Sequence, residues 1–172
     1  SRHLSKRQQF PKINLLNVGR ISKEKGQYPM LQSMNQIPAN SFQITIVGKL
    51  SNEQKISLEF ENLVNEMKKN GFSINLPGYL SDIKNEISKN DFLIVSSIVP
   101  EAFGITAIEA MARGVIVLAN RQDSLSEFIV HQETGLFYDA DDPQSLPNLI
   151  HEIQDQKYDL IQIRKNAYQM VK

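Results

Sequence analysis

The chain contains no cysteine among its 172 residues, which excludes disulfide bonds and metal sites built on thiolates. It also has no apolar run approaching the ~20 residues that a membrane-spanning helix needs, and no signal peptide is visible. Nineteen basic residues balance nineteen acidic ones, so no net charge is available to attract nucleic acid. These absences favour a cytoplasmic protein without a nucleic-acid partner.

The composition is that of one globular domain, with 41% hydrophobic and 22% charged residues and enough chain to bury a sizeable core. Strand and helix patterns alternate along the chain. We expect strands at residues 13–18, 43–48, 73–76, 92–96, 115–119 and 135–137, and helices at residues 27–36, 52–69, 81–89, 105–112, 124–130, 143–155 and 159–170.

Two of the expected strands, at residues 92–96 and 115–119, are apolar on both faces. Strands of this kind are typical of a parallel sheet that is covered by helices on both sides. The sequence therefore predicts an α/β fold with a doubly wound, Rossmann-like parallel sheet.

Glu101 and Glu109 lie eight positions apart, the first on a loop broken by Gly104 and the second on the small, apolar helix that follows. A fully helical segment would separate the carboxylates by roughly 12 Å, whereas a hydrolysing pair needs roughly 5–9.5 Å. The spacing therefore disfavours a glycosidase.

Two separate contacts remain for these glutamates. Each carboxylate could accept hydrogen bonds from the hydroxyls of a different ring, while the free amides of Gly104, Ile105 and Thr106 hold an anion between them. A sugar joined to a nucleoside by a diphosphate has this order of groups. A capping carboxylate plus a solvated helix glutamate is the structural alternative.

A basic loop, from Gly19 to Gly26, directly follows the first expected strand. Ligands of open α/β sheets bind at the carboxyl ends of strands, where this loop lies. Arg20 offers a planar fork and Lys25 a mobile point charge, which together suit two linked phosphates without a metal. The glycine spacing is not that of a P-loop, and a solvated surface loop is the alternative.

Together, the two clusters resemble motifs of the retaining glycosyltransferases of family 4, which have the two-domain GT-B fold. The Gly-Arg loop carries a lysine five positions after the arginine, and the Glu-x7-Glu motif contains Phe103-Gly104. The likeness covers about residues 12–153 and only the C-terminal half of that fold. It implies that residues 1–11 are an interdomain hinge remnant and that residues 12–172 form the nucleotide-sugar-binding domain. The chain would then be a fragment that lacks its N-terminal acceptor domain and is inactive alone.

The resemblance also implies roles for individual residues. The catalytic residues would be Arg20 and Lys25, which bind the diphosphate, and Glu101, which contacts the transferred sugar. Glu109 would hold the ribose, the amides after Phe103 the distal phosphate, and the backbone around Tyr79 and Leu80 the base edge. The complete set of implied substrate-binding residues is Gly19, Arg20, Lys25, Tyr79, Leu80, Glu101, Phe103, Gly104, Ile105, Thr106 and Glu109.

Three segments depart from the family pattern. Lys49 stands where an acidic residue usually follows Val47-Gly48, Val115-Ile116 replaces a common Thr-Pro, and residues 122–127 replace a loop with two glycines. None of these positions is a predicted diphosphate contact, so we expect donor binding to survive them.

No cofactor or metal is expected. Asp139-Ala140-Asp141 looks like a metal-binding Asp-x-Asp, but Asp142-Pro143 follows at once and suits the start of a helix. His3, His131 and His151 are scattered without the spacing of metal ligands.

The function that we predict is donor binding in a retaining glycosyltransferase, which transfers a sugar from a nucleoside-diphosphate sugar to a glycan or lipid-linked acceptor in glycan or surface polysaccharide synthesis. The missing N-terminal domain would supply the acceptor contacts and any peripheral contact with the inner face of the membrane. Two alternatives stay open. One is a non-catalytic nucleotide-sensing or interaction module with a Rossmann-like fold, and the other is an epimerase or phosphorylase of the same two-domain architecture.

Overall fold

The computed structural model describes residues 12–101 and 104–172, which form a six-stranded, all-parallel sheet between two layers of helices. The predicted hinge remnant, residues 1–11, lies outside the described residues. In chain order the elements are β1 (Ile13–Val18), α1 (Gln27–Met34), η1 (Ala39–Ser41), β2 (Phe42–Val47), α2 (Gln54–Lys69), β3 (Ser73–Gly78), α3 (Ile83–Ser88), β4 (Phe92–Val95), α4 (Ile105–Ala112), β5 (Ile116–Asn120), η2 (Asp123–Leu125), β6 (Leu136–Tyr138), α5 (Ser145–Gln154) and α6 (Leu160–Val171).

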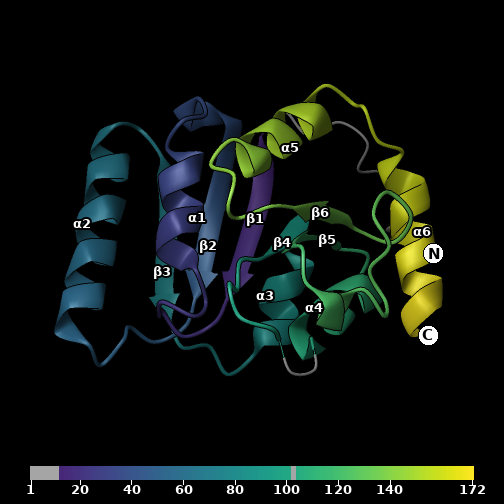
Figure 1. The fold of residues 1–172 in the computed structure, drawn as a ribbon, viewed down its shortest axis with the longest axis horizontal. Helices are drawn as coiled ribbons and strands as arrows, with labels where there is room; N and C mark the ends of the chain where they lie inside the picture. Colours follow the sequence, from purple (N-terminus) through teal and green to yellow (C-terminus); the bar gives the residue numbers. More distant parts are fainter. Residues whose placement is uncertain (1–11, 102–103) are drawn as a thin grey trace.

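The strand order is β3-β2-β1-β4-β5-β6, which confirms the predicted doubly wound sheet (Figure 1). The chain moves outward from β1 to β3 and then returns to the other side of β1 as β4. Loops that leave the carboxyl ends of β1 and β4 therefore diverge, and open α/β sheets bind their ligands at such a reversal.

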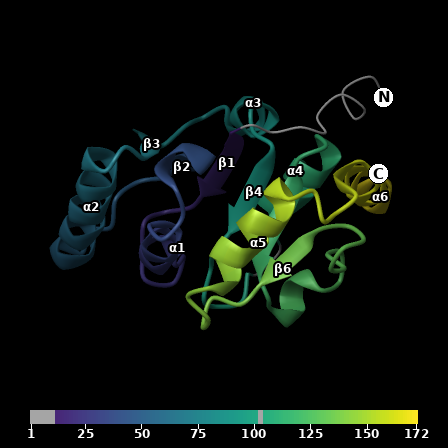
Figure 2. The same ribbon diagram turned by 90° about the horizontal axis from the view of Figure 1, so that it is seen from above.

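Helices α1, α2 and α5 lie on one face of the sheet and α3, α4 and α6 on the other (Figure 2). Helix α2 shows why the helices pack as they do: its buried residues Phe60, Leu63, Val64 and Met67 recur at helical spacing and form one apolar stripe. On the other face, the small side chains of α4 let that helix pack closely against the sheet. No helix in the described part of the chain is both long and apolar enough to cross a membrane.

All six strands lie within two residues of their predicted positions, but the helix expected at residues 124–130 is wrong. The chain forms only the 3-10 turn η2 (Asp123–Leu125) and then a further turn. The Thr134 hydroxyl donates to the carbonyl oxygen of Phe128 and accepts from the amide of Val130, so it takes backbone groups that a continuing helix would have used.

Helix α5 begins at Ser145, two residues later than predicted. Asp142, expected to cap this helix, lies in the turn before it, because Gln144 takes the N-cap position; the Asp142 carboxylate accepts a hydrogen bond from the amide of Gln144 at 2.9 Å. The carboxylate of Asp139 accepts in the same way from the amide of Asp141, also at 2.9 Å. These aspartates stabilise the turn before the helix.

Two glycines with similar backbone angles provide a test of how closely the loops pack. Gly26 (φ 67°) and Gly78 (φ 78°) are both left-handed, but a Cβ on Gly26 would lie 2.2 Å from the carbonyl oxygen of Ser96, whereas one on Gly78 would meet nothing within 4 Å. We expect Gly78→Ala to lower the free energy of unfolding by about 1–2 kcal/mol from the left-handed conformation alone. Gly26→Ala should cost clearly more, because it also pushes the loop after β1 away from the end of β4. Urea unfolding of both variants measures the difference, and equal losses would contradict this tight contact.

Candidate functional site

Two cavities meet at the carboxyl edge of the sheet, beside the reversal between β1 and β4. The smaller, of 70 Å³, is lined by Lys25, Glu101 and the start of α4. The larger, of 620 Å³, extends over the ends of β1, β2 and β3 and is lined by Arg20, Tyr79 and Leu80. Val18 and Thr106 line both cavities, so the two lie side by side, and we refer to them together as the crevice.

Lys25 and Glu101 form an ion pair at the smaller cavity, although 76 positions separate them in the chain. The distance between Lys25 Nζ and Glu101 Oε1 is 2.9 Å. The Ser97 hydroxyl donates to the same carboxylate oxygen. Burial raises the pKa of Glu101, but the hydrogen bonds from Ser97 and Lys25 and the charge of Lys25 outweigh it and hold the pKa below its ordinary value. Glu101 is therefore an ionised, oriented acceptor.

The basic loop from Gly19 to Gly26 is held in shape by Gln27, whose side chain is completely buried. Its amide nitrogen donates to the carbonyl oxygens of Gly19 at 3.2 Å and Arg20 at 3.1 Å, and its oxygen accepts from the amide of Ser22 at 3.3 Å. The guanidinium of Arg20 is exposed and makes no hydrogen bond or ion pair with the residues described here. It is available to a ligand.

The same loop is also attached to the loop after β2. The amide of Gly19 donates to the carbonyl oxygen of Val47 at 2.8 Å, and the amide of Ile21 donates to that of Lys49 at 2.9 Å. A Cβ on Gly48 would lie 2.0 Å from the carbonyl oxygen of Gly19. The two backbones therefore touch directly beneath the crevice.

Helix α4 begins at the smaller cavity without a side-chain cap. Gly104, with φ 59°, precedes its first turn, and a Cβ there would lie 2.7 Å from the ring of Phe128. Gly104, Ile105 and Thr106 all line the cavity. The uncapped first-turn amides and the positive end of the helix dipole favour an anion at this point.

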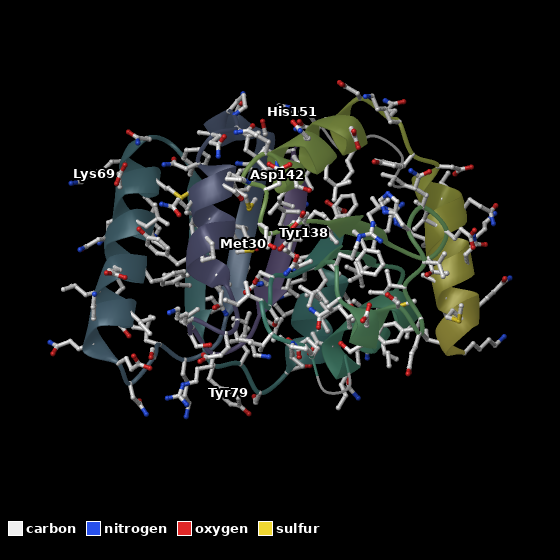
Figure 3. All side chains as sticks on the ribbon, in the orientation of Figure 1. Met30, Lys69, Tyr79, Tyr138, Asp142 and His151 are labelled. Atoms are coloured by element: carbon white, nitrogen blue, oxygen red, sulfur yellow. The ribbon has the colours of Figure 1, made fainter. Side chains whose placement is uncertain are left out.

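At the other end of the crevice, Tyr79 is 69% exposed, and the nitrogen of Lys49 lies 5.7 Å from the centre of its ring. Figure 3 shows Tyr79 at the end of the molecule toward which β1 and β3 point, whereas Lys69 and His151 lie at the opposite end. The exposed ring and the neighbouring Leu80 provide an apolar surface on which a flat group can lie.

Glu109 lines neither of these two cavities. It lies one helical turn after Thr106, on the same side of α4, and its carboxylate is 4.0 Å from the nitrogen of Lys84. Glu109 thus lies next to the crevice without entering it. Phe103, the remaining predicted site residue, lies outside the described residues.

Sequence reasoning missed several residues that hold this site. Asn17, Gln27 and Gln122 had no assigned role, yet Gln122 accepts a hydrogen bond from the amide of Glu101 at 2.6 Å. For Asn17 and Gln122 the signal is a polar residue at or just after the end of a buried strand, which needs hydrogen-bond partners across the sheet edge. Gln27 is the first residue of α1 and carries no such signal. Within residues 12–101 and 104–172, no group of three or more histidine, aspartate or glutamate side chains could hold a metal ion.

Comparisons with known proteins identify the fold. A structure of Anabaena Alr3699/HepE in complex with UDP-glucose has a TM-score of 0.82 and 25% sequence identity, covering 93% of this chain and 44% of that one. The C-terminal domain of a glycosyl transferase group 1 family protein from Francisella tularensis has a TM-score of 0.76 and 25% identity, covering 92% of this chain and 84% of that one.

A curated relative, the lipopolysaccharide 1,2-N-acetylglucosaminetransferase of Salmonella typhimurium, is 32% identical over 145 residues, which are 81% of this chain and 38% of that protein. The chain spans about two fifths of the length of this relative and of a second curated relative that it matches.

The sheet order and the crevice at its reversal define one half of a GT-B glycosyltransferase fold. The family model for glycosyl transferases group 1 matches residues 4–170, and the chain belongs to this family.

The ion pair at Glu101 gives the stability of the domain a specific dependence on pH. Because the pKa of Glu101 is lower in the folded than in the unfolded state, its contribution is complete above the ordinary value of about 4.5 and is lost as the pH falls through the lower folded pKa. We expect the wild-type free energy of unfolding to decrease on acidification more steeply than that of Glu101→Gln. Urea unfolding at a series of pH values measures both curves, and parallel curves would show that the ion pair adds nothing to stability.

Proposed function

We propose that this domain binds the donor of a retaining, family 4 glycosyltransferase, which transfers a sugar from a nucleoside-diphosphate sugar to a glycan or lipid-linked acceptor. The observation that carries the proposal is the arrangement around the smaller cavity, where a cation, a carboxylate and an uncapped helix start converge. Such a set of groups matches the junction between a diphosphate and a sugar.

Each part of the ligand has a counterpart along the crevice. The base would lie against Tyr79 and Leu80, the diphosphate between Arg20 and the amides of α4, and the transferred sugar against Glu101. Glu109, one helical turn after Thr106 on α4, would accept hydrogen bonds from the ribose hydroxyls. The UDP-glucose complex of the Anabaena protein, which shares this fold, supports a nucleotide sugar as the ligand.

The chemical contribution of this half would be electrostatic. When the bond between the anomeric carbon and the distal phosphate oxygen breaks, negative charge develops on the diphosphate. Arg20, Lys25 and the first amides of α4 would stabilise that charge. Glu101 would orient the sugar ring while the acceptor oxygen, held by an N-terminal domain, attacks the anomeric carbon, and the proton of the acceptor hydroxyl would leave with the diphosphate.

The Salmonella relative acts on lipopolysaccharide, and this supports a role in surface polysaccharide synthesis. The lack of cysteine supports a cytoplasmic location, with any contact to the inner face of the membrane made by the N-terminal domain.

The first test is binding of a nucleoside diphosphate by calorimetry in the presence of a chelator. We expect binding without a divalent metal, because Arg20 and Lys25 supply the compensating charge. Charge-assisted hydrogen bonds contribute about 1.5–3 kcal/mol each, so Arg20→Ala should weaken binding about tenfold or more.

The matched control is Lys23→Ala, which removes an exposed positive charge from the same loop but at a residue that lines neither cavity. It should change the affinity little. Binding that requires added magnesium or manganese, or equal losses in both variants, would contradict the proposal. A non-catalytic interaction module without a nucleotide site would not bind at all.

The second test uses the ion pair to distinguish the sugar from the diphosphate. Glu101→Gln should weaken binding of the correct sugar nucleotide about tenfold, because the sugar loses a charged hydrogen-bond acceptor. The bare nucleoside diphosphate should bind slightly more tightly, because Lys25 no longer pairs with a carboxylate. An ion pair this exposed contributes about 0.2–1 kcal/mol, which corresponds to a gain of about 1.5- to 5-fold. Loss of both ligands to the same extent would show that Glu101 only supports the fold.

A further inference from the structure

Two asparagines hold the segment that continues β4 from opposite sides. The Asn17 side chain, near the carboxyl end of β1, donates through Nδ2 to the carbonyl oxygen of Ile94 at 3.0 Å and to the Ser96 hydroxyl at 2.9 Å. Asn120, at the end of β5, donates through Nδ2 to the carbonyl oxygen of Ser97 at 3.0 Å. Each Nδ2 thus holds the chain near the end of β4, that of Asn17 at Ile94 and Ser96 and that of Asn120 at Ser97.

Their side-chain oxygens differ. Asn120 Oδ1 accepts a hydrogen bond from the amide of Ala140 at 2.9 Å. Asn17 is only 2% exposed, yet within the described part of the chain its Oδ1 has no hydrogen-bond partner. Rotating the amide by half a turn would place Oδ1 against the carbonyl oxygen of Ile94. The bonds made by Nδ2 therefore fix which atom is left open.

A buried acceptor of this kind normally receives a hydrogen bond. Asn17 lines the 70 Å³ cavity together with Lys25, Glu101 and the start of α4. That volume is large enough for about two water molecules at roughly 30 Å³ each. The cavity has a mainly polar lining and lies beside the larger cavity, so its occupant can be either solvent or part of a ligand.

The groups around the cavity restrict the chemistry of this occupant. The first amides of α4 and the ammonium group of Lys25 are hydrogen-bond donors, and an anion alone could accept from all of them. Asn17 Oδ1 offers only lone pairs, which repel an anion and need a donor. A hydroxyl group meets both demands, because it can donate to Asn17 and accept from the donors opposite.

We propose that Asn17 is a ligand-facing residue of the donor site, whose Oδ1 accepts a hydrogen bond from a hydroxyl bound in this cavity and thereby contributes to donor affinity. The hydroxyl comes either from an ordered water beneath the diphosphate or from the transferred sugar. The contribution of Asn17 to donor affinity rests on the proposed function, whereas the hydroxyl bound to Oδ1 does not.

The experiment compares Asn17→Ala with Asn120→Ala. Both variants lose one amide that holds the same segment, so both should lose stability, but only Asn17→Ala removes an open acceptor. We expect Asn17→Ala to weaken donor binding about three- to tenfold more than Asn120→Ala does, measured by calorimetry with a nucleoside diphosphate and with its sugar nucleotide. Crystal structures of the wild-type chain, with and without the sugar nucleotide, serve as the second measurement if Asn17→Ala does not fold.

Comparing the affinity lost for the nucleoside diphosphate with that lost for the sugar nucleotide distinguishes a water from a sugar hydroxyl as the group bound to Asn17. Equal losses for both ligands, with an ordered water at hydrogen-bond distance from Oδ1, indicate the water. A loss confined to the sugar nucleotide, with a sugar oxygen at that distance, indicates the sugar hydroxyl.

The proposal is overturned if Asn17→Ala loses no more affinity than Asn120→Ala, or if no oxygen lies at hydrogen-bond distance from Oδ1 in either crystal structure. If the wild-type chain binds neither ligand, the proposed function fails. In that case the ligand-free crystal still shows whether a water occupies the cavity.

Discussion

Parallel pairing of β1 with strands on both of its sides is the constraint on which the rest of the structure depends. Strand β1 pairs with β2 along its whole length. On its other side, β1 pairs with the first two residues of β4. Because the chain leaves the carboxyl ends of β1 and β4 toward opposite faces of the sheet, a crevice opens between the two loops. Lys25 and Glu101 come from these two loops, so their contact follows directly from the strand order.

The site balances its own charge while it is free of ligand. Lys25 and Glu101 neutralise each other, and the Ser97 hydroxyl provides a further hydrogen bond to the carboxylate. Among residues 12–101 and 104–172, no negative group pairs with the guanidinium of Arg20, and no side chain caps the start of α4. Under the proposed function, a diphosphate adds negative charge beside them, and an uncharged sugar replaces solvent around the carboxylate. The ligand therefore meets a site already oriented for it, which lowers the cost of binding.

Much of this arrangement could be predicted from the sequence because it depends on local patterns. The runs at residues 92–96 and 115–119 are apolar on both faces, which is enough to predict buried parallel strands. Gly104 next to a small, apolar helix likewise predicts an open helix start. The segment at residues 124–130 misled because its helix-like pattern competes with Thr134, a residue that lies beyond the pattern and binds the backbone groups involved.

Contacts between distant segments could not be predicted in this way. The ion pair between Lys25 and Glu101 and the hydrogen bond from Glu101 to Gln122 join loops that follow different strands. Their existence depends on the order of the strands in the sheet, which local periodicity does not encode. Gln27 and Asn17 were missed for a related reason, since a polar side chain near a loop looks exposed until its buried partners are known.

The direct contact between Gly19 and Gly48 has a consequence for the kinetics of ligand capture. The pairing of β1 and β2 continues into the loops that follow them. The start of the basic loop therefore cannot move toward a ligand without breaking backbone hydrogen bonds. Adjustment to a ligand is then left to the side chains of Arg20 and Lys25, which rearrange in picoseconds to nanoseconds, whereas loops move in nanoseconds to microseconds. Under the proposed function, ligand capture by this domain should therefore need rearrangement of these two side chains and not of the loop backbone.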